Sequence, residues 1–203
     1  MTRVCLIGND DVNLQYELLS HETSREALAT YDLRRPFENS LAVRTVSVGA
    51  AVSLLNDLQW YLTRFVSVAI VQDPSVSDEE WLSRSLATEL RNGDVEPQET
   101  AEFCKVYGLE RVERGATAPA AGGSDPGATS GSAIRDGDGN GAGEDTESAT
   151  EPDDETDENG ADSTYRLVEP LYVRRTDGDL PAYDLREVEE TVVVRLTESE
   201  YAP

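Results

Sequence analysis

The side chains that could act as a general base or a nucleophile are few in this sequence. His21 is the only histidine, and histidine is the side chain whose unperturbed pKa places its change of charge near neutral pH. A Ser–His–Asp or Cys–His site needs such a base beside its nucleophile, but no Gly-x-Ser-x-Gly motif accompanies His21. Cys5 and Cys104 are too few for a disulfide framework or a cysteine zinc site, and they are typical of a reducing compartment. The sequence therefore predicts no catalytic residue, no cofactor and no metal ion.

Three aspartates could together form a site for Mg²⁺, and this is the alternative to a protein without a metal ion. Asp10 and Asp11 directly follow the first apolar segment, and Asp73 follows another apolar segment. Acids at the carboxyl end of a strand can hold Mg²⁺ for phosphoryl chemistry, and this order of segments faintly resembles the phosphate-receiver domains of signalling proteins. The lysine that those domains use has no counterpart, because Lys105 lies in a different kind of segment. We prefer the interpretation that Asp10 or Asp11 caps a helix.

Residues 136–147 match the loop pattern of EF-hand calcium sites, D-x-[DN]-x-[DN]-G-x5-E. The oxygen ligands fall at the required positions, but Gly143 replaces the usual apolar residue at the eighth position. Neither flank has the pattern of an amphipathic helix. An Asp- and Gly-rich segment produces such a match by chance, so we do not predict specific calcium binding.

Two pairs of adjacent arginines, Arg34–Arg35 and Arg174–Arg175, are the densest basic points of the sequence. A guanidinium can bind a carboxylate or phosphate with two parallel hydrogen bonds, so Arg34 and Arg35 are candidate binding residues. The alternative is that these arginines pair with neighbouring Asp and Glu side chains.

Three aromatic residues, Trp60, Tyr61 and Trp81, are candidates for a protein-binding surface. Tryptophan and tyrosine are enriched at protein–protein interfaces because they combine a large apolar area with a polar group. The alternative is that they belong to the hydrophobic core.

The helices that would position these residues are read from apolar spacing and capping signals. The strongest periodic signal spans residues 49–71, where the apolar residues step by three or four positions: Ala51, Leu55, Leu58, Leu62, Phe65 and Ala69. We predict one helix there, and the alternative is a strand over residues 66–71. Four further helices are expected: one capped by Asp10 or Asp11, one from Thr23 to about Tyr31, one from Ser77 to Gly93 and one from Pro97 to Tyr107.

Four short segments have the composition of strands: residues 4–7, 41–48, 167–175 and 191–196. Two strands are not stable alone in water, so the C-terminal two are expected to pair with the N-terminal two. The predicted fold class is α+β, with a small mixed or antiparallel sheet of about four strands packed by helices.

A segment of different composition separates the two pairs of strands. Residues 115–163 hold 13 Asp and Glu residues against the single base Arg135, with no aromatic residue. Such a segment buries too little apolar surface to offset the entropy of ordering it. We therefore predict an N-terminal part over residues 1–112, a disordered acidic tether over residues 113–164, and C-terminal strands over residues 165–203 that complete the same domain.

The charge of the sequence limits its partners and its environment. The formal net charge is −24, and Lys105 is the only lysine. This charge disfavours nucleic acid, whose binding depends on clustered Arg and Lys, and it disfavours anionic membrane surfaces. The most apolar long segment contains Asn56, Asp57, Gln59 and Arg64, so no membrane span is expected. Met1-Thr2-Arg3 leads directly into a short apolar segment, so we expect no secretory signal and a cytoplasmic protein.

Three runs of residues resemble an uncharacterised family of small acidic proteins from haloarchaea: Tyr31–Glu38, Leu55–Tyr61 and Val188–Arg195. This resemblance implies a halophilic protein and no assigned activity. High salt screens the repulsion among crowded carboxylates, because the Debye length is about 3 Å at 1 M. We predict a non-enzymatic protein-interaction or regulatory module whose partner is another protein. The alternative is a Mg²⁺-dependent phosphoacceptor or hydrolase-like site at Asp10, Asp11 and Asp73.

Overall fold

The computed structural model describes residues 1–113, 163–176, 179–181, 188 and 190–202. The EF-hand-like run at residues 136–147, and all but the ends of the expected tether at residues 113–164, lie outside the described residues. Among the described helices, none combines the length and the apolar composition that crossing a membrane requires.

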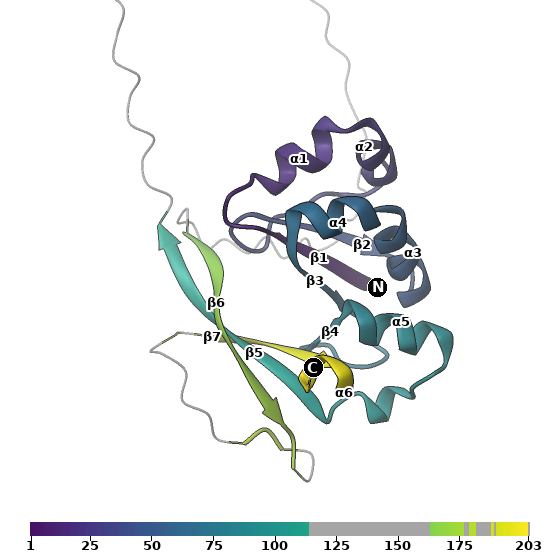
Figure 1. Cartoon of the computed structure of the whole chain (residues 1–203), viewed down its shortest axis with the longest axis vertical. Helices are drawn as coiled ribbons and strands as arrows, with labels where there is room; N and C mark the ends of the chain where they lie inside the picture. The colour runs from purple at the N-terminus through teal and green to yellow at the C-terminus, as the bar shows by residue number, and fades with distance from the viewer. Residues whose placement is uncertain (114–162, 177–178, 182–187, 189, 203) are drawn as a thin grey trace, which may run out of the picture. The chain divides into compact units, whose positions relative to one another are not determined.

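The described strands form one mixed sheet in the order β2-β1-β3-β4-β7-β5-β6 (Figure 1). Neighbouring strands are antiparallel except for the parallel pair β4 and β7. The strands are β1 (Thr2–Gly8), β2 (Ser40–Thr45), β3 (Val66–Gln72), β4 (Trp81–Ser83), β5 (Phe103–Glu113), β6 (Ser163–Arg174) and β7 (Glu190–Leu196). The α+β class is confirmed, but the four-stranded sheet is wrong, because the described residues alone form seven strands, and β3, β4 and β5 arise from segments predicted as helices.

Five of the six α-helices in the described part of the chain precede β5. They are α1 (Leu14–Ser20), α2 (Glu22–Leu28), α3 (Val48–Asp57), α4 (Gln59–Phe65) and α5 (Arg84–Asn92), followed by the 3-10 turn η1 (Pro97–Glu99) and the C-terminal α6 (Glu198–Tyr201). The cap of α1 is Asn13, whose side chain accepts a hydrogen bond from the backbone of Tyr16. Asp10 and Asp11 therefore do not cap this helix and are left in the loop before it.

The long helix expected over residues 49–71 is wrong in its last third, because the chain leaves α4 at Phe65 and continues as β3. Ile70 faces one hydrophobic cluster and Val71 the other, so both faces of β3 are covered by apolar residues. A strand that is buried on both faces has no polar alternation, so its apolar run cannot be distinguished from a helix by periodicity. The alternative interpretation of residues 66–71 as a strand is correct.

Two other predicted helices are also wrong in part. The segment expected as a helix from Pro97 to Tyr107 contains only the short turn η1 and then β5, in which Cys104 and Tyr107 face opposite clusters. The helix expected from Ser77 begins six residues later, because Trp81–Ser83 pairs as β4 and the Ser83 hydroxyl then caps α5. Sheet pairing overrides the local helix signals at both places.

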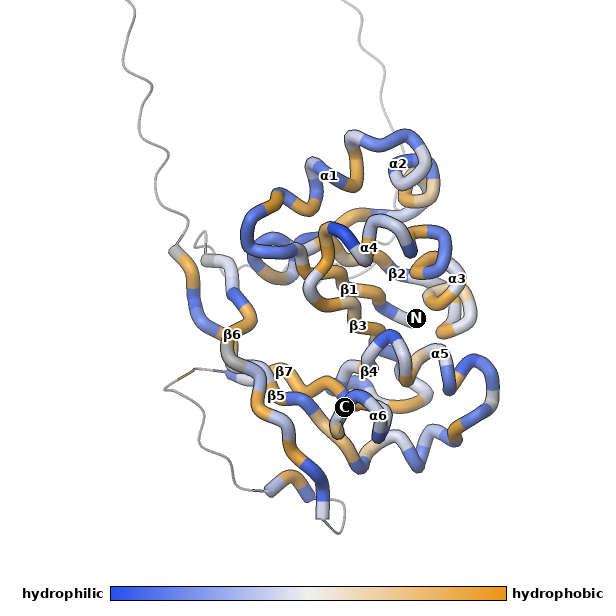
Figure 2. The backbone as a smooth tube through the Cα atoms, viewed as in Figure 1, coloured by the Kyte–Doolittle hydropathy of each residue, from blue (hydrophilic) through white to orange (hydrophobic). Residues whose placement is uncertain are grey.

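Two main hydrophobic clusters lie on opposite faces of the sheet. The larger one joins β1–β4 to the inner sides of α1–α5. The second joins Cys5 and Ile70 to Tyr107 and Val194, so the inner face of the curled sheet brings β1 and β3 against β5 and β7. Apolar segments accordingly run through β1 and β3, while polar residues mark the outer sides of the helices (Figure 2). This curl places residues from distant parts of the sequence around one cleft.

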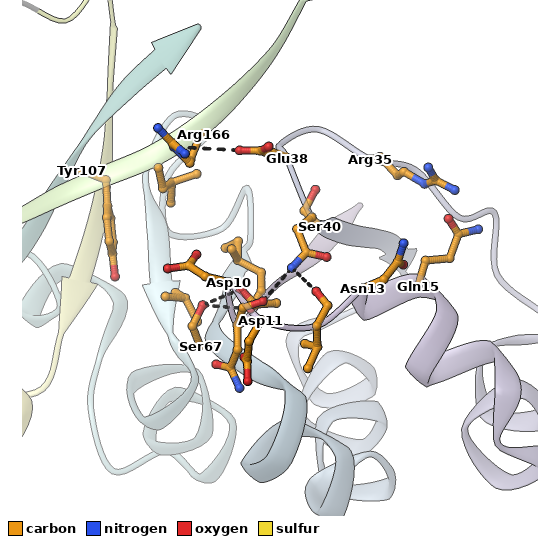
Figure 3. Close-up of a pocket in the computed structure, with 17 residues that line it drawn as sticks. Asp10, Asp11, Asn13, Gln15, Arg35, Glu38, Ser40, Ser67, Tyr107 and Arg166 are labelled. Atoms are coloured by element: carbon orange, nitrogen blue, oxygen red, sulfur yellow. Dashed lines mark hydrogen bonds and ion pairs between the residues drawn. The ribbon is translucent and has the colours of Figure 1, made fainter. Parts of the chain in front are cut away.

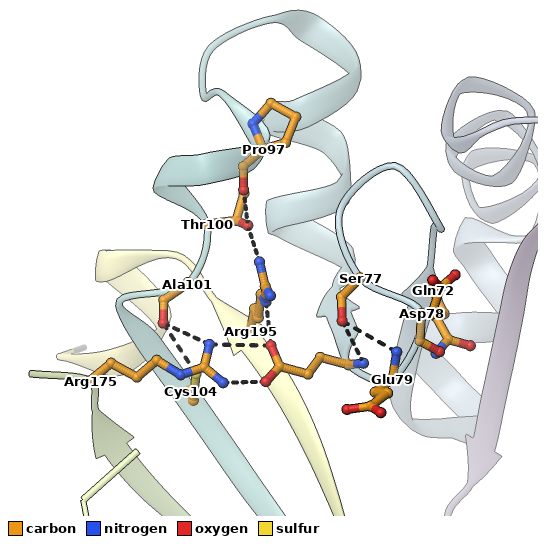
Figure 4. Close-up of polar contacts among 11 residues, drawn as sticks. Gln72, Ser77, Asp78, Glu79, Pro97, Thr100, Ala101, Cys104, Arg175 and Arg195 are labelled. Atoms are coloured by element: carbon orange, nitrogen blue, oxygen red, sulfur yellow. Dashed lines mark hydrogen bonds and ion pairs between the residues drawn. The ribbon is translucent and has the colours of Figure 1, made fainter. Parts of the chain in front are cut away.

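A mostly buried ion cluster ties β7 and the residue after β6 to the segment before β4 (Figure 4). The Glu80 carboxylate accepts hydrogen bonds from Arg175 and, at 2.6 Å, from Nε of Arg195. These three side chains are 17%, 9% and 12% exposed. Arg195 also donates to Thr100 at 2.8 Å, and Arg175 donates to the carbonyl of Ala101 at 3.2 Å. Burial alone would raise the pKa of Glu80, but the hydrogen bonds from both arginines outweigh burial and hold that pKa below its ordinary value.

Candidate functional site

Strand β4 covers only half of the edge of β3 that faces away from β1. β3 pairs with β1 along most of its length, but it pairs with β4 only at Ile70 and Val71. Continuing the antiparallel register would place Arg84 opposite Ala69, but α5 begins at Arg84 because Ser83 caps it. The exposed edge over residues 66–69 therefore results from a strand that ends early in favour of a helix. An uncovered edge offers backbone N–H and C=O groups to another chain.

Two neighbouring cavities, with volumes of about 1110 and 290 Å³, lie along this edge. Both are lined by Ser67, Val68 and Tyr107. We call this combined space the β3 cleft. β3 forms one wall, and residues of β5 and β7, including Lys105, Tyr107 and Leu196, form the opposite wall of the smaller cavity. The cleft is therefore flanked on both sides by strands, which suits an extended ligand.

The loop between β1 and α1 carries Asp10 and Asp11 and borders the larger cavity (Figure 3). Asn39 fixes this loop. Asn39 has a positive φ of 48°, a conformation that asparagine tolerates better than most residues. Its side chain donates to the carbonyls of Asn9 and Val12 and accepts from the backbone of Leu14, each at 2.9 Å. A Cβ at Gly8 would lie 2.5 Å from Nδ2 of Asn39, so only glycine allows this contact. Neutral hydrogen bonds therefore hold the loop in place.

The larger cavity has a mixed but mainly acidic rim, formed by Asp10, Asp11, Glu38, Arg35 and Arg166. The Arg166 guanidinium lies 2.8 Å from Glu110 and 3.9 Å from Glu38. The hydrogen bond that Arg166 donates to Glu110, together with the nearby acids, raises the pKa of Arg166. Of the two arginines on this rim, Arg35 has no acidic partner among the described residues, and the exposed Asp10 and Asp11 outnumber it. We call this region the acidic end of the cleft.

The smaller cavity receives two cations, Lys105 from β5 and Arg84 from the start of α5. The Lys105 ammonium lies 4.9 Å from the ring centre of Tyr107 and 5.4 Å from that of Tyr172. Arg84 donates to two neutral amide oxygens, those of Asn56 and Gln59. Among the described residues, neither cation lies within ion-pair distance of a carboxylate. We call this region the basic end of the cleft.

Burial and neighbouring groups shift the pKa values of the two cations in opposite directions. Burial lowers the pKa of Arg84, which still leaves an arginine charged at neutral pH. Burial also acts to lower the pKa of Lys105, but a hydrogen bond with Tyr107 and the proximity of Tyr107 and Tyr172 outweigh burial and raise this pKa. Both side chains are therefore cationic at neutral pH.

The residues predicted from the sequence separate into those that reach the cleft and those that do not. Asp10, Asp11 and Arg35 line the acidic end. Arg34 instead pairs with Asp32 at 3.1 Å, and its backbone bridges to Ala42. The prediction that adjacent arginines pair with neighbouring acids thus describes Arg34 but not Arg35.

Asp73 lies at the opposite end of β1 from Asp10 and Asp11. Its carboxylate accepts a hydrogen bond from the hydroxyl of Thr2, the first residue of β1, and from Ser75. Burial would raise the pKa of Asp73, but these hydrogen bonds lower it. The seven residues of β1 separate the two ends by about 20 Å at the usual rise of a strand. One Mg²⁺ ion therefore cannot bind all three aspartates, since carboxylate–metal distances are about 2–2.6 Å.

The three aromatic residues predicted to form a protein-binding surface do not lie on a common surface. Tyr61 and Trp81 are buried in different hydrophobic clusters, and the guanidinium of Arg3 covers the Trp81 ring at 5.5 Å. Trp60 is 56% exposed on α4, beside His21 at a ring distance of 6.0 Å. Only Trp60 remains available for a contact on the outer surface.

Sequence reasoning missed the residues that give the cleft its shape and charge: Asn39, Ser67, Arg84, Lys105, Tyr107 and Arg166. The strongest available signal was the position of Lys105, the only lysine, two residues before Tyr107. In a strand, residues two apart face the same side, so reading Phe103–Tyr107 as a strand would have placed both side chains on one face.

Comparison with known proteins gives a family but no function. The model of one protein family, described as a family of unknown function (DUF5804), matches residues 2–109. This span includes β3, Arg84, Lys105 and Tyr107, as well as two of the three runs on which the family resemblance was based. No curated protein and no solved structure matches significantly.

Proposed function

Because the chain belongs to this family of unknown function, we propose its role from the geometry of the β3 cleft: a non-enzymatic module that binds an extended segment of a partner protein. The observation that carries the proposal is the uncovered edge of β3 over residues 66–69, which lines a cavity between two walls of strands. An added strand would pair its backbone with this edge, and side chains on the walls would select the sequence.

The short edge and the walls beside it favour one bound strand over open-ended association. Exposed sheet edges promote aggregation unless they are short or covered. This edge spans four residues, and it is recessed between α4 on one side and β5 and β7 on the other. A single extended segment fits such a space, whereas a second folded copy would have to project a free strand into it.

The test is selection of peptides on the full chain in 2 M KCl, from a displayed library of random eight-residue sequences. Main-chain pairing predicts that methylation of backbone nitrogens at alternate positions of a selected peptide abolishes binding, while methylation at the positions between is tolerated. Tolerance at every position would reject strand addition.

A matched pair of variants locates the binding. Ser67 is exposed and lines both cavities, so Ser67→Trp should block the cleft. Ser53→Trp makes the same change on an exposed position of α3 and should leave binding unchanged. Equal effects of both substitutions would show that the peptide binds elsewhere.

We also propose that the protein works in a cytosol with molar salt, and the net charge of −24 supports this. Repulsion among the acids weakens when the Debye length falls to about 3 Å at 1 M salt. The free energy of unfolding in denaturant should therefore rise from 0.1 M to 2 M KCl. A constant value over this range would contradict the proposal.

A further inference from the structure

The charge arrangement at the basic end of the cleft differs from that of the other partly buried cations. Lys105 and Arg84 line one cavity of about 290 Å³. Arg175 and Arg195, by comparison, share the carboxylate of Glu80. In a chain with 41 acidic residues, two cations that share one cavity but have no carboxylate within ion-pair distance, among the described residues, call for an explanation.

Neutral groups hold both cations in place without cancelling their charge. The amides of Asn56 and Gln59 fix the Arg84 guanidinium, and the rings of Tyr107 and Tyr172 flank the Lys105 ammonium. Cation–π contacts and amide hydrogen bonds orient a charge while leaving it free to attract an anion. The two cations are therefore positioned before any ligand arrives.

The cavity also contains one acid, Glu200, and this acid determines which anion fits. The Glu200 carboxylate accepts hydrogen bonds from the Ser83 hydroxyl at 2.5 Å and from the Thr197 backbone at 3.0 Å. With Glu200 ionised, the two cations leave one uncompensated positive charge. A singly charged carboxylate balances this charge, whereas a doubly charged phosphate would leave an excess negative charge in a recessed site.

We propose that Lys105 and Arg84 bind a carboxylate of the segment that pairs with β3. This inference rests on the proposed function and names the chemistry that the segment must carry. The carboxylate is either the free C-terminus of the segment or the side chain of an Asp or Glu in it. With the carboxylate at the basic end, the remainder of the segment extends along β3 towards Asp10 and Asp11, where a basic residue is favoured. The charges of the cleft thereby set the direction in which the segment binds.

Lys105 offers a direct probe because no other lysine is present. Reductive methylation with ¹³C-formaldehyde labels its amine and keeps its charge, and the α-amine supplies a second signal as an internal control. In 1 M KCl, N-acetylglycine should shift the Lys105 signal with saturation, whereas N-acetylglycinamide should not. The Arg84→Gln variant should lose the response, and Arg91→Gln, an exposed change on the same helix, should keep it. An equal shift with the amide would overturn the proposal, and so would a stronger response to inorganic phosphate.

Peptide affinities supply the second test and separate the two sources of the carboxylate. A selected peptide is compared with its C-terminal amide and with its Glu→Gln or Asp→Asn forms by fluorescence anisotropy. Removing the relevant carboxylate should weaken binding to the wild type about tenfold, and it should have no further effect on Lys105→Gln. If the wild type and Lys105→Gln lose equal affinity when the carboxylate is removed, the contact between the carboxylate and Lys105 is rejected. If alternate N-methylation has no effect while the carboxylate dependence persists, strand addition fails and the carboxylate site stands.

Discussion

The ion cluster around Glu80 and the basic end of the β3 cleft each contain two cations, but only the first contains a carboxylate shared by them. At Glu80, Arg175 and Arg195 donate to one acid, to Thr100 and to the carbonyl of Ala101. At the basic end, Lys105 and Arg84 contact aromatic rings and neutral amides. Both regions lie on the same sheet, so the difference is local.

This difference separates charges that hold the fold together from charges that are available to a ligand. Removing one partner of a buried ion pair leaves an uncompensated charge and is strongly destabilising. Removing a cation that has no charged partner costs only its neutral contacts. Substitutions at the two places should therefore affect stability very differently.

The largest effect is expected for Glu80→Gln. Two arginines, 9% and 12% exposed, would lose their carboxylate. The free energy of unfolding should fall by about 3–5 kcal/mol, measured by denaturant unfolding in 2 M KCl. The adjacent and exposed Glu79→Gln should change it by less than about 0.5 kcal/mol. A loss below about 1 kcal/mol at Glu80 would mean that the cluster contributes little to the fold.

The same variant gives a pH dependence of defined sign. The pKa of Glu80 is lower in the folded protein than in the unfolded chain, where glutamate titrates near pH 4.3. Its stabilisation is therefore complete above that pH and is lost as the pH falls through the lower folded-state pKa. The difference in unfolding free energy between the wild type and Glu80→Gln should shrink from pH 6 to pH 3. All other acids are common to both proteins, so a constant difference would contradict the role of Glu80.

A smaller effect is expected at the acidic end of the cleft, where neutral contacts fix the wall. In Gly8→Ala the new Cβ would lie 2.5 Å from Nδ2 of Asn39 and 2.9 Å from Cβ of Leu14. Such overpacking should lower the free energy of unfolding by about 1–3 kcal/mol, equally at pH 6 and pH 4. Gly49→Ala is the control, since its Cβ would meet nothing closer than 3.7 Å within helix α3 and should stabilise the protein slightly.

The smallest effect is expected for Lys105→Gln. The substitution removes the ammonium from two tyrosine rings but leaves no opposite charge unpaired. The free energy of unfolding should fall by at most about 1 kcal/mol, although the binding of carboxylates should be lost. A loss as large as that of Glu80→Gln would mean that Lys105 is structural and would remove the contrast between the two regions.

Strands with a clear local signal were predictable from the sequence. The segments at residues 4–7, 41–48 and 191–196 are short and rich in β-branched residues, and they correspond to β1, β2 and β7. The class α+β followed from these strands and the helical segments between them. Asp10, Asp11 and Arg35 were identified as binding candidates, and all three line the cleft.

The number of strands was not predictable, because the three strands that the sequence analysis missed, β3, β4 and β5, are defined by the strands with which they pair. Val68 and Ile70 face one cluster and Val66 and Val71 the other, so β3 has no polar face to reveal its period. β4 is three residues long and pairs with β7, more than a hundred residues away in the sequence. No local pattern can specify such a pairing.

The sequence by itself determined the excess of acids, the single lysine and the class of fold, because each depends on composition or on local periodicity. Only the tertiary structure decided that β4 ends at Ser83, that the edge of β3 is thereby uncovered, and that Lys105 and Arg84 face one cavity. The physical reason is that the pairing of a charge depends on which side chains the folded sheet brings within a few ångströms. Glu80 meets its two arginines across 95 and 115 residues of sequence, whereas the same folding leaves Lys105 among rings.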